Sequence, residues 1–247
     1  MKYKALMIDL DGTTVPHFTD NASERVVQAV IRAHDVVSVS LVTGRPLPMT
    51  VQLIEKLQIT GPCVLLNGAQ IYDPGKKEIV RELQMTQEEA DYVYSHIHSF
   101  SDSLVVHDGK KDLKGELWKE LEHVVSFYLF DVSPAIVASI VKIFENHPSL
   151  TTNRMLGSKP GLEAIEVINK QATKQFGIYE VAKLLNISTH EIIGVGDGYN
   201  DFALLMACGL KVAMGNAVPE LKAVADFIAP SVDEDGLAVV IEKFILE

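Results

Sequence analysis

Short apolar runs that alternate with amphipathic segments constrain the fold of this chain more than any other feature. Residues 3–8, 36–42 and 63–66 are apolar runs, and helical spacing predicts helices over 23–34 and 48–57. Strands buried on both faces read as unbroken apolar runs, as in parallel sheets. The β-α-β-α-β order therefore predicts a doubly wound, parallel-sheet α/β core.

The regular alternation of strands and helices ends in the middle of the chain. Thr86 and Glu89 form a capping box, which begins a helix that ends near Phe100. The elements expected next are two strands, a helix and two strands, over residues 104–107, 124–132, 133–146, 150–155 and 161–168. This α-β-β-α-β-β order predicts a separate, smaller α+β domain.

The alternation of strands and helices resumes near residue 169. The elements expected there are helices over 170–185, 202–207 and 236–246, and strands over 191–195, 211–214 and 226–228. We therefore predict a Rossmann-like, doubly wound core from residues 1–81 and 169–247, interrupted by a smaller α+β domain inserted at residues 82–168. A length of 247 residues fits such a division.

The composition narrows the classes of partner. A formal net charge of −11 argues against nucleic acid or an anionic membrane as partner. No stretch is apolar for long enough to span a bilayer, and no signal-peptide pattern opens the chain. Two cysteines in apolar surroundings, Cys63 and Cys208, do not indicate a disulfide framework, so we expect a cytoplasmic location. The sequence does not indicate an oligomeric state.

Polar residues follow several of the buried strands at the points where the strands end. The segments are Asp9-Leu-Asp11-Gly-Thr13, Thr43-Gly44-Arg45, Asn67-Gly68 and Gly196-Asp197-Gly-Tyr-Asn200-Asp201. Open parallel sheets bind ligands at the carboxyl ends of their strands, so we expect these segments to meet at one rim.

The residue types at this rim favour phosphoryl transfer with a hard cation. Carboxylates without a cysteine or histidine cluster suit Mg²⁺. One carboxylate can attack phosphorus while a neighbour handles protons. Thr43 and the N–H of Gly44 can hold phosphate oxygens. Lys174 is well placed to offset the negative charge, although Lys170, one turn earlier, could compete for this role.

These segments, in this order and together with Lys174, resemble the four motifs of the haloacid dehalogenase superfamily. More narrowly, the chain resembles the Cof-like, sugar-phosphatase branch. Three further sequence segments support this narrower resemblance, namely Leu66-Asn67-Gly68-Ala69, Val212-Ala-Met-Gly-Asn216-Ala and Asp233-Glu-Asp-Gly236. The resemblance covers both core segments. In the insertion it concerns position and element order only, since that branch carries an α/β cap between its second and third motifs.

The resemblance implies a Mg²⁺-dependent phosphatase that works through an aspartyl-phosphate. Asp9 would be the nucleophile, and Asp11 would protonate the leaving oxygen, deprotonate the attacking water and offer its backbone carbonyl to the metal. Phosphate binding is implied for Thr43, Gly44, Lys174 and Asn200, and metal binding for Asp9, Asp11, Asp197 and Asp201. Arg45 either faces the substrate or pairs with a surface carboxylate.

The expected substrate is a small phosphomonoester, such as a sugar phosphate. One alternative is a phosphomutase of the same superfamily, which would pass the phosphoryl group to another sugar hydroxyl. A more remote alternative is a phospho-receiver signalling domain, against which the length, the insertion and the Asp197 loop argue. We expect Trp118, Tyr128 and Phe130 to belong to the core of the inserted domain.

Overall fold

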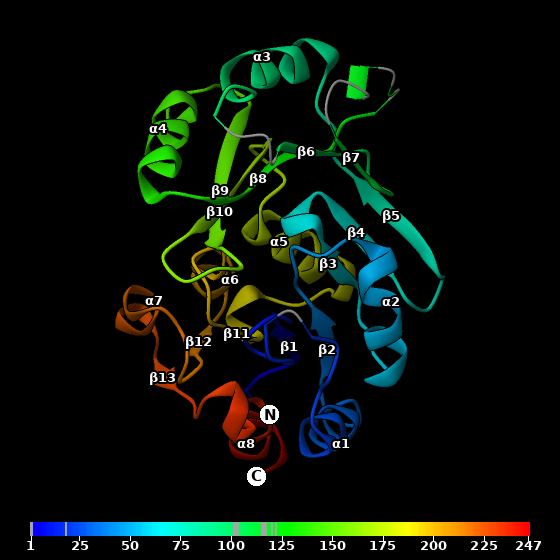
Figure 1. The fold of residues 1–247 in the computed structure, drawn as a ribbon. Helices are drawn as coiled ribbons and strands as arrows, with labels where there is room; N and C mark the ends of the chain where they lie inside the picture. Colours follow the sequence, from blue (N-terminus) through cyan, green and yellow to red (C-terminus); the bar gives the residue numbers. More distant parts are fainter. Residues whose placement is uncertain (1, 18, 101–103, 115–117, 120, 122) are drawn as a thin grey trace.

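A parallel sheet forms the centre of the larger part of the molecule (Figure 1). The computed structural model describes residues 2–17, 19–100, 104–114, 118–119, 121 and 123–247. In the order β13-β12-β11-β1-β2, the strands are Phe227–Ile228, Leu210–Ala213, Ile192–Gly196, Ala5–Ile8 and Ser38–Leu41. Ala5 pairs with Ile192 on one side and Ser38 on the other, so β1 is central. The predicted parallel core is confirmed.

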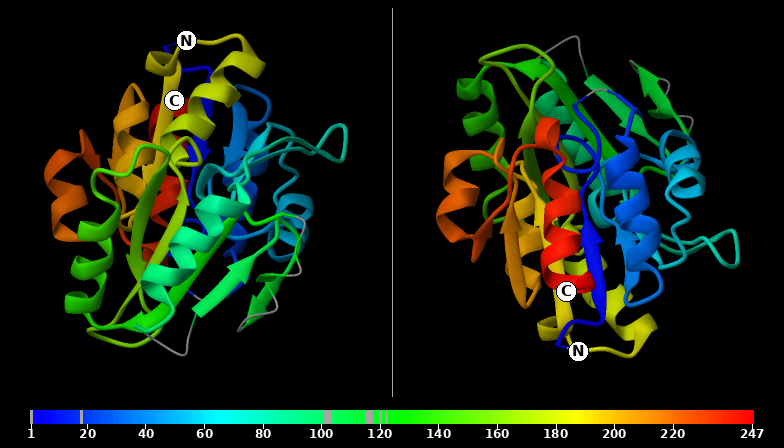
Figure 2. Two further views of the ribbon diagram at one scale, coloured as in Figure 1. Left: turned by 90° about the horizontal axis from the view of Figure 1, so that it is seen from above. Right: turned by 90° about the horizontal axis from the view of Figure 1, so that it is seen from below.

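Helices cover both faces of this sheet, as a doubly wound fold requires (Figure 2). α1 and α8 pack together on one face, and α5 and α6 pack together on the other. The helices of this part are α1 (Glu24–Ala33), α2 (Leu47–Lys56), α5 (Lys174–Leu185), α6 (Asp201–Ala207), α7 (Pro219–Val224) and α8 (Gly236–Ile241), the last followed by a π-helical turn (Glu242–Leu246). Short 3₁₀ turns lie at Leu66–Gly68, Thr189–Glu191 and Val232–Glu234.

An antiparallel hairpin extends the core beyond β2. β3 (Cys63–Leu65) joins the parallel sheet through a bridge between Val42 and Val64. It pairs instead with β4 (Gln70–Asp73), which pairs with β5 (Glu78–Glu82). The hairpin was not predicted, although the Asp73 side chain accepts hydrogen bonds from two N–H groups of its turn.

The inserted segment carries its own antiparallel sheet, in the order β7-β6-β8-β10-β9. Its elements are α3 (Gln87–Ile97), β6 (Leu104–His107), β7 (Asp112–Lys114), β8 (Ser126–Val132), α4 (Pro134–Phe144), β9 (Leu150–Leu156) and β10 (Glu163–Asn169). The capping box of Thr86 and Glu89 begins α3 as expected. α3 and α4 lie at the top of Figure 1, and the sheet lies between them and the parallel core.

Among the described residues, the two larger hydrophobic clusters lie one in each part, and a third, smaller cluster contains residues of both. The cap cluster includes Trp118, Phe127, Leu129 and Phe144. This supports a cap with its own core, while the boundaries at residues 82 and 168 remain a prediction. Among the described residues, no helix combines the length and the apolar character needed to cross a bilayer.

One predicted boundary is wrong in an informative way. We expected a helix from residue 170, but α5 begins at Lys174, after Thr173 accepts a hydrogen bond from the N–H of Phe176. Lys170 therefore precedes the helix, and its exposed amine donates to the carbonyl oxygen of His147 at 3.5 Å. β7 and α7 were also not predicted.

Candidate active site

Three buried carboxylates gather at the carboxyl end of the parallel sheet. Asp9 directly follows β1, Asp197 follows β11, and Asp201 begins α6. One oxygen from each lies within 4.8 Å of the others. Carboxylates this close repel one another unless a cation separates them, so the set suits a hard divalent metal ion.

Lys174 supplies a positive charge inside this cluster. Its amine lies 2.6 Å from an oxygen of Asp9 and 2.6 Å from an oxygen of Asp201, and all three side chains are buried. Burial alone would lower the pKa of Lys174, but the attraction of Asp201 and Asp9 raises it above its ordinary value. Lys174 rather than Lys170 reaches the cluster.

The carboxylates carry more negative charge than Lys174 offsets. Burial raises the pKa of Asp9 well above its usual value, and repulsion by Asp201 adds to this, while Lys174 acts in the opposite direction. Burial also raises the pKa of Asp197, against the hydrogen bond to His17. The residues present therefore fit a bound cation, which would relieve this repulsion.

Backbone geometry fixes the cluster in place. The two oxygens of Asp201 have different partners, since one contacts Lys174 and the other accepts from the N–H groups of Asp197 and Gly198, both at 2.9 Å. The hydroxyl of Thr13 donates to Asp197 at 3.1 Å. Gly12 adopts a φ of +81°, and a Cβ there would collide with the Asp197 carboxylate. Only glycine allows so close an approach.

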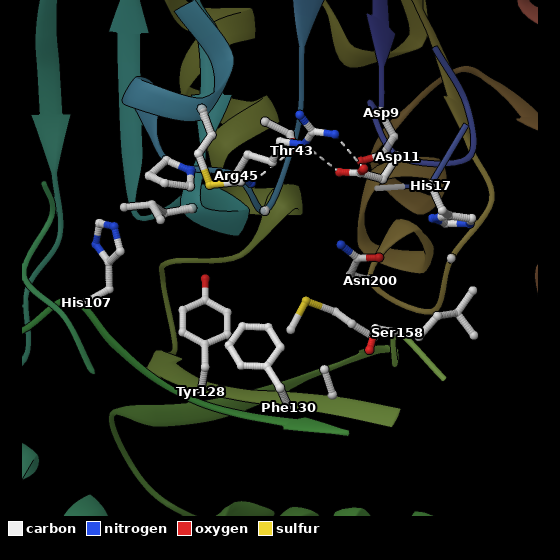
Figure 3. Close-up of a pocket in the computed structure, with 18 of the residues that line it drawn as sticks. Asp9, Asp11, His17, Thr43, Arg45, His107, Tyr128, Phe130, Ser158 and Asn200 are labelled. Atoms are coloured by element: carbon white, nitrogen blue, oxygen red, sulfur yellow. Dashed lines mark hydrogen bonds and ion pairs between the residues drawn. The ribbon is translucent and has the colours of Figure 1, made fainter. Parts of the chain in front are cut away.

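The Asp11 carboxylate turns towards Arg45 instead of joining the cluster (Figure 3). The guanidinium donates to both Asp11 oxygens, at 2.8 and 2.7 Å, and also pairs with Asp20. The sequence left two roles open for Arg45, facing the substrate or pairing with a surface carboxylate. In the structure Arg45 pairs with a carboxylate, but that partner, Asp11, is a predicted site residue that lines the cavity.

Thr43 and Gly44 lie beside this pair, where β2 ends. The buried hydroxyl of Thr43 accepts a hydrogen bond from the N–H of Arg45 at 3.1 Å, so it can donate its own proton to a ligand. Gly44 lines the same cavity as Asp9 and Asp11.

Asn200 connects the Asp197 loop to the cap through a chain of side-chain hydrogen bonds. Its amide donates to the Asn67 oxygen at 3.0 Å, and the Asn67 amide donates to Glu166 of β10 at 2.7 Å. Asn67 has a φ of 52°, which turns its side chain between the two parts of the molecule. The sequence pointed to Asn67 as a strand-end residue but gave no sign of Glu166.

Sequence reasoning missed two further contacts. The ring nitrogen Nε2 of His17 lies 3.1 Å from Asp197, and the hydrogen bond between them raises the pKa of this histidine. The amide of Asn216 donates to the carbonyl of Gly12 at 2.8 Å. His17 follows no predicted strand, so no sequence pattern indicated it. Asn216 lies in the segment Val212-Ala-Met-Gly-Asn216-Ala, which supports the family resemblance, but no role was predicted for it.

A cavity of about 730 Å³ lies between the core and the cap. Eight of the nine predicted site residues line it, namely Asp9, Asp11, Thr43, Gly44, Arg45, Asp197, Asn200 and Asp201. Lys174 is buried outside the lining, in contact with Asp9 and Asp201. These residues, chosen from the sequence, therefore lie on the core side of one cavity, and their catalytic and binding roles remain predictions.

The cap side contradicts one prediction. Trp118 is buried in the cap core as expected, but Tyr128 and Phe130 line the cavity, where Figure 3 shows their rings pointing towards the core residues. Along β8, Phe127 and Leu129 point into the cap core, so the alternation of a strand places Tyr128 and Phe130 on the other face.

A family model of haloacid dehalogenase-like hydrolases matches residues 6–116 and 109–241 of this chain. The chain belongs to this family. As a haloacid dehalogenase-like hydrolase, it is a phosphatase-type enzyme, and the predicted family and enzyme class are confirmed. The phospho-receiver alternative is not supported.

Relatives and solved structures agree with this membership. The 5-amino-6-(5-phospho-D-ribitylamino)uracil phosphatase YwtE of Bacillus subtilis is 27% identical over 286 residues, covering 98% of both proteins. The structure of a haloacid dehalogenase-like hydrolase from B. subtilis matches with a TM-score of 0.85 at 22% identity, covering 98% of this chain and 100% of that one. A subclass IIB sugar phosphatase of the superfamily matches with a TM-score of 0.81 at 23% identity, covering 98% of each chain.

Proposed function

We propose that this hydrolase releases phosphate from a small phosphomonoester, with Asp9 as the nucleophile and Mg²⁺ as cofactor. The observation that carries the proposal is the contact of buried Lys174 with Asp9, inside a cluster of three carboxylates that opens onto a large cavity. The curated relative YwtE is named a phosphatase of a phosphorylated ribitylamino-uracil, which supports a small organic phosphate as substrate.

In the first step, a carboxylate oxygen of Asp9 attacks phosphorus as the bond from phosphorus to the leaving oxygen breaks. Lys174 stabilises the ionised form of Asp9 and offsets the charge of the phosphoryl group. Thr43 and the N–H of Gly44 bind phosphoryl oxygens, and Asn200 orients the group from the opposite loop. In the second step, water attacks the phosphorus of the aspartyl-phosphate, and phosphate leaves with Asp9 restored.

Asp11 handles protons in both steps. It gives a proton to the leaving oxygen and then takes one from the attacking water. Both of its oxygens accept hydrogen bonds from Arg45, and each oxygen keeps a second lone pair that can take up the proton. Arg45 thereby holds Asp11 at the cavity wall between turnovers.

Asp9, Asp197, Asp201 and the backbone carbonyl of Asp11 are the proposed holders of Mg²⁺. The repulsion among the three buried carboxylates supports this assignment. When bound, the ion neutralises negative charge on the phosphoryl group. Closure of the cap over the cavity excludes bulk water from the phosphoryl group.

The test is phosphate release from a panel of phosphorylated metabolites and p-nitrophenyl phosphate, with Mg²⁺ or with a chelator. We expect Asp9→Asn to lower kcat by on the order of 10⁴-fold, because the nucleophile is lost. Asp91→Asn, an exposed change on α3, is the matched control. Equal activity of Asp9→Asn and wild type would refute the proposal.

The same assay separates hydrolysis from the phosphomutase alternative. A hydrolase releases inorganic phosphate in step with loss of the ester, whereas a mutase yields an isomeric ester and depends on a bisphosphorylated sugar. Acid-quenched enzyme should also carry one phosphoryl group on the peptide that contains Asp9.

A further inference from the structure

A fully buried glutamate lies where the cap meets the core. Along β10, Ile165 and Val167 point into the cap core, so the alternation of the strand turns Glu166 to the other face of the cap sheet. Ala164, two residues earlier on that face, lines the cavity. The side chain of Glu166 is 0% exposed. Glutamate is almost never buried in full unless it is paired, so the partners of Glu166 show what it does there.

The hydrogen-bond partners of Glu166 include two amides and no cation. Its Oε2 accepts a hydrogen bond from Nδ2 of Asn67 at 2.7 Å and a second from Nδ2 of Asn153 at 3.0 Å. Among the described residues, no lysine or arginine forms an ion pair with it. A buried carboxylate without a cationic partner is a poor source of stability. What Glu166 does impose is a direction, because an oxygen that accepts from both amides can only receive their protons.

Glu166 fixes which way round the Asn67 amide lies. Oε2 offers only lone pairs to this amide, whether or not the other carboxyl oxygen carries a proton. Asn67 must therefore turn its NH₂ group to Glu166 and its carbonyl oxygen away from it. The Asn67 side chain is itself buried and packs on Gly44, where a Cβ would lie 3.0 Å from the amide nitrogen. The fixed amide thus lies beside a residue of the predicted phosphate site.

Asn67 in turn fixes the amide of Asn200. The Asn67 oxygen accepts a hydrogen bond from Nδ2 of Asn200 at 3.0 Å, so Asn200 must present its NH₂ group on this side. That nitrogen carries two N–H groups, and the described residues accept only one of them. The second is left for a ligand in the cavity, which Asn200 lines together with Asp11 and Thr43 (Figure 3). A phosphoryl oxygen accepts from such an N–H group, whereas a reversed amide would turn a carbonyl oxygen towards it.

We propose that Glu166 is a positioning residue of the cap, which acts through Asn67 to turn the N–H groups of Asn200 towards the phosphoryl group. The inference rests on the proposed function, in which Asn200 binds that group, and it deepens that function. A residue of the cap determines the direction of a hydrogen bond in the phosphate site of the core. The phosphate site is therefore complete only while the cap lies against the core.

The experiment makes the change Glu166→Met in two backgrounds and uses an ester that wild type cleaves in the phosphate-release panel. In wild type, loss of the carboxylate lets both asparagine amides reverse. We expect kcat/KM to fall about tenfold, the value of one hydrogen bond to a charged group, and the inhibition constant of inorganic phosphate to rise by a similar factor. In the Asn200→Ala background, the same change should leave both constants within about twofold, since Glu166 acts through Asn200.

An exchange of acid and amide tests the direction itself. In Asn67→Asp/Glu166→Gln the carboxylate at position 67 still offers only lone pairs to Asn200, and the amide at position 166 can donate to it. We expect kcat/KM to stay within about threefold of wild type. Asn67→Gly tolerates the φ of 52° at this position but removes the acceptor, and should lose about tenfold.

Asn153→Ala is the matched control. It removes the other amide that donates to the same oxygen of Glu166, but Asn153 lies on β9, outside the chain to Asn200, and does not line the cavity. We expect kcat/KM and the inhibition constant of phosphate to stay within about twofold of wild type.

The outcomes separate the inference from the proposed function. If wild type cleaves an ester but Glu166→Met has no effect, or has an equal effect with and without the Asn200 amide, the positioning role is wrong. It is also wrong if the exchanged pair is as poor as Asn67→Gly, and this comparison decides alone if Glu166→Met does not fold. If wild type cleaves no ester, the proposed function fails, and the inference fails with it.

Discussion

At the scale of single residues, Lys174 decides how three carboxylates can share a buried space. Isolated charges are costly to bury, and the cluster is tolerated because the amine contacts both Asp9 and Asp201. The same contact places a cation beside the proposed nucleophile. Stability and chemistry therefore depend on one side chain.

Replacing Lys174 with methionine keeps the length of the side chain and removes its charge. We expect Lys174→Met to lower the free energy of unfolding by about 3 kcal/mol in a chelator, because the carboxylates lose their buried partner. The loss should be smaller in Mg²⁺, which binds the folded carboxylates and stabilises them. Urea unfolding of wild type and Lys174→Met, with a chelator and with Mg²⁺, measures the loss in the free energy of unfolding under each condition.

Lys170→Met is the matched control, since that lysine is exposed and lies outside the cluster. It should shift the free energy of unfolding by less than about 0.5 kcal/mol. An equal effect of the two substitutions would contradict the role assigned to Lys174.

At the scale of elements, the contact of α5 with β3 brings the helix of Lys174 close to the rim. Gly177 of α5 faces Val64 of β3, and a Cβ at Gly177 would lie 2.5 Å from a methyl carbon of Val64. In an exposed helix, glycine to alanine is stabilising. Here the added methyl group has no room.

We therefore expect Gly177→Ala to destabilise the protein by about 1–3 kcal/mol, as overpacking does. Val64→Ala removes the methyl groups that collide with it, so the double variant should be more stable than the sum of the two single changes predicts. Thermal and urea unfolding of wild type, the two single variants and the double variant give the free energies of a double-mutant cycle. If the two effects on stability simply add, α5 moves to accommodate the new methyl group and the collision with Val64 does not occur.

The order of elements was readable from the sequence because buried parallel strands are continuous apolar runs. The hairpin of β4 and β5 was not, since β4 is buried but begins and ends with polar residues, and β5 is largely polar and exposed. Asp9 and Asp197 were predictable as strand-end residues. His17 was not, because its place beside Asp197 arises from an irregular loop. Phe130 was misjudged because its type suggests a core, and only the strand's orientation shows which face it occupies.

At the scale of the whole molecule, Glu166 connects the cap to the core. It is fully buried and accepts hydrogen bonds from Asn67 of the core and Asn153 of the cap. Burial raises the pKa of Glu166 above its ordinary value, although these hydrogen bonds act in the opposite direction. The contact between the two parts therefore depends on pH.

The direction of this pH dependence follows from how tightly Glu166 binds its proton in the folded and unfolded states. The folded protein holds the Glu166 proton more tightly than the unfolded chain does, so this contribution is fully present below the ordinary pKa of a glutamate. It is lost as the pH rises through the raised value. We expect the free energy of unfolding of wild type, relative to Glu166→Gln, to fall as the pH rises across that window.

Urea unfolding of both proteins at a series of pH values checks this expectation. Glu78→Gln, a change of the same charge at an exposed position of β5, is the control and should show no such trend relative to wild type. A difference between wild type and Glu166→Gln that does not vary with pH would contradict the assignment.

The central position of β1 has a consequence for how the protein is made. Its partner β2 follows soon after it, but its other partner, β11, is synthesised only after the whole cap, since Ala5 pairs with Ile192. The cap sheet, by contrast, is built from one continuous stretch of chain. Long-range pairing is slow, so on the ribosome the cap can mature first. The three carboxylates meet only when β11 docks, so the active site cannot be complete before this long-range pairing has formed.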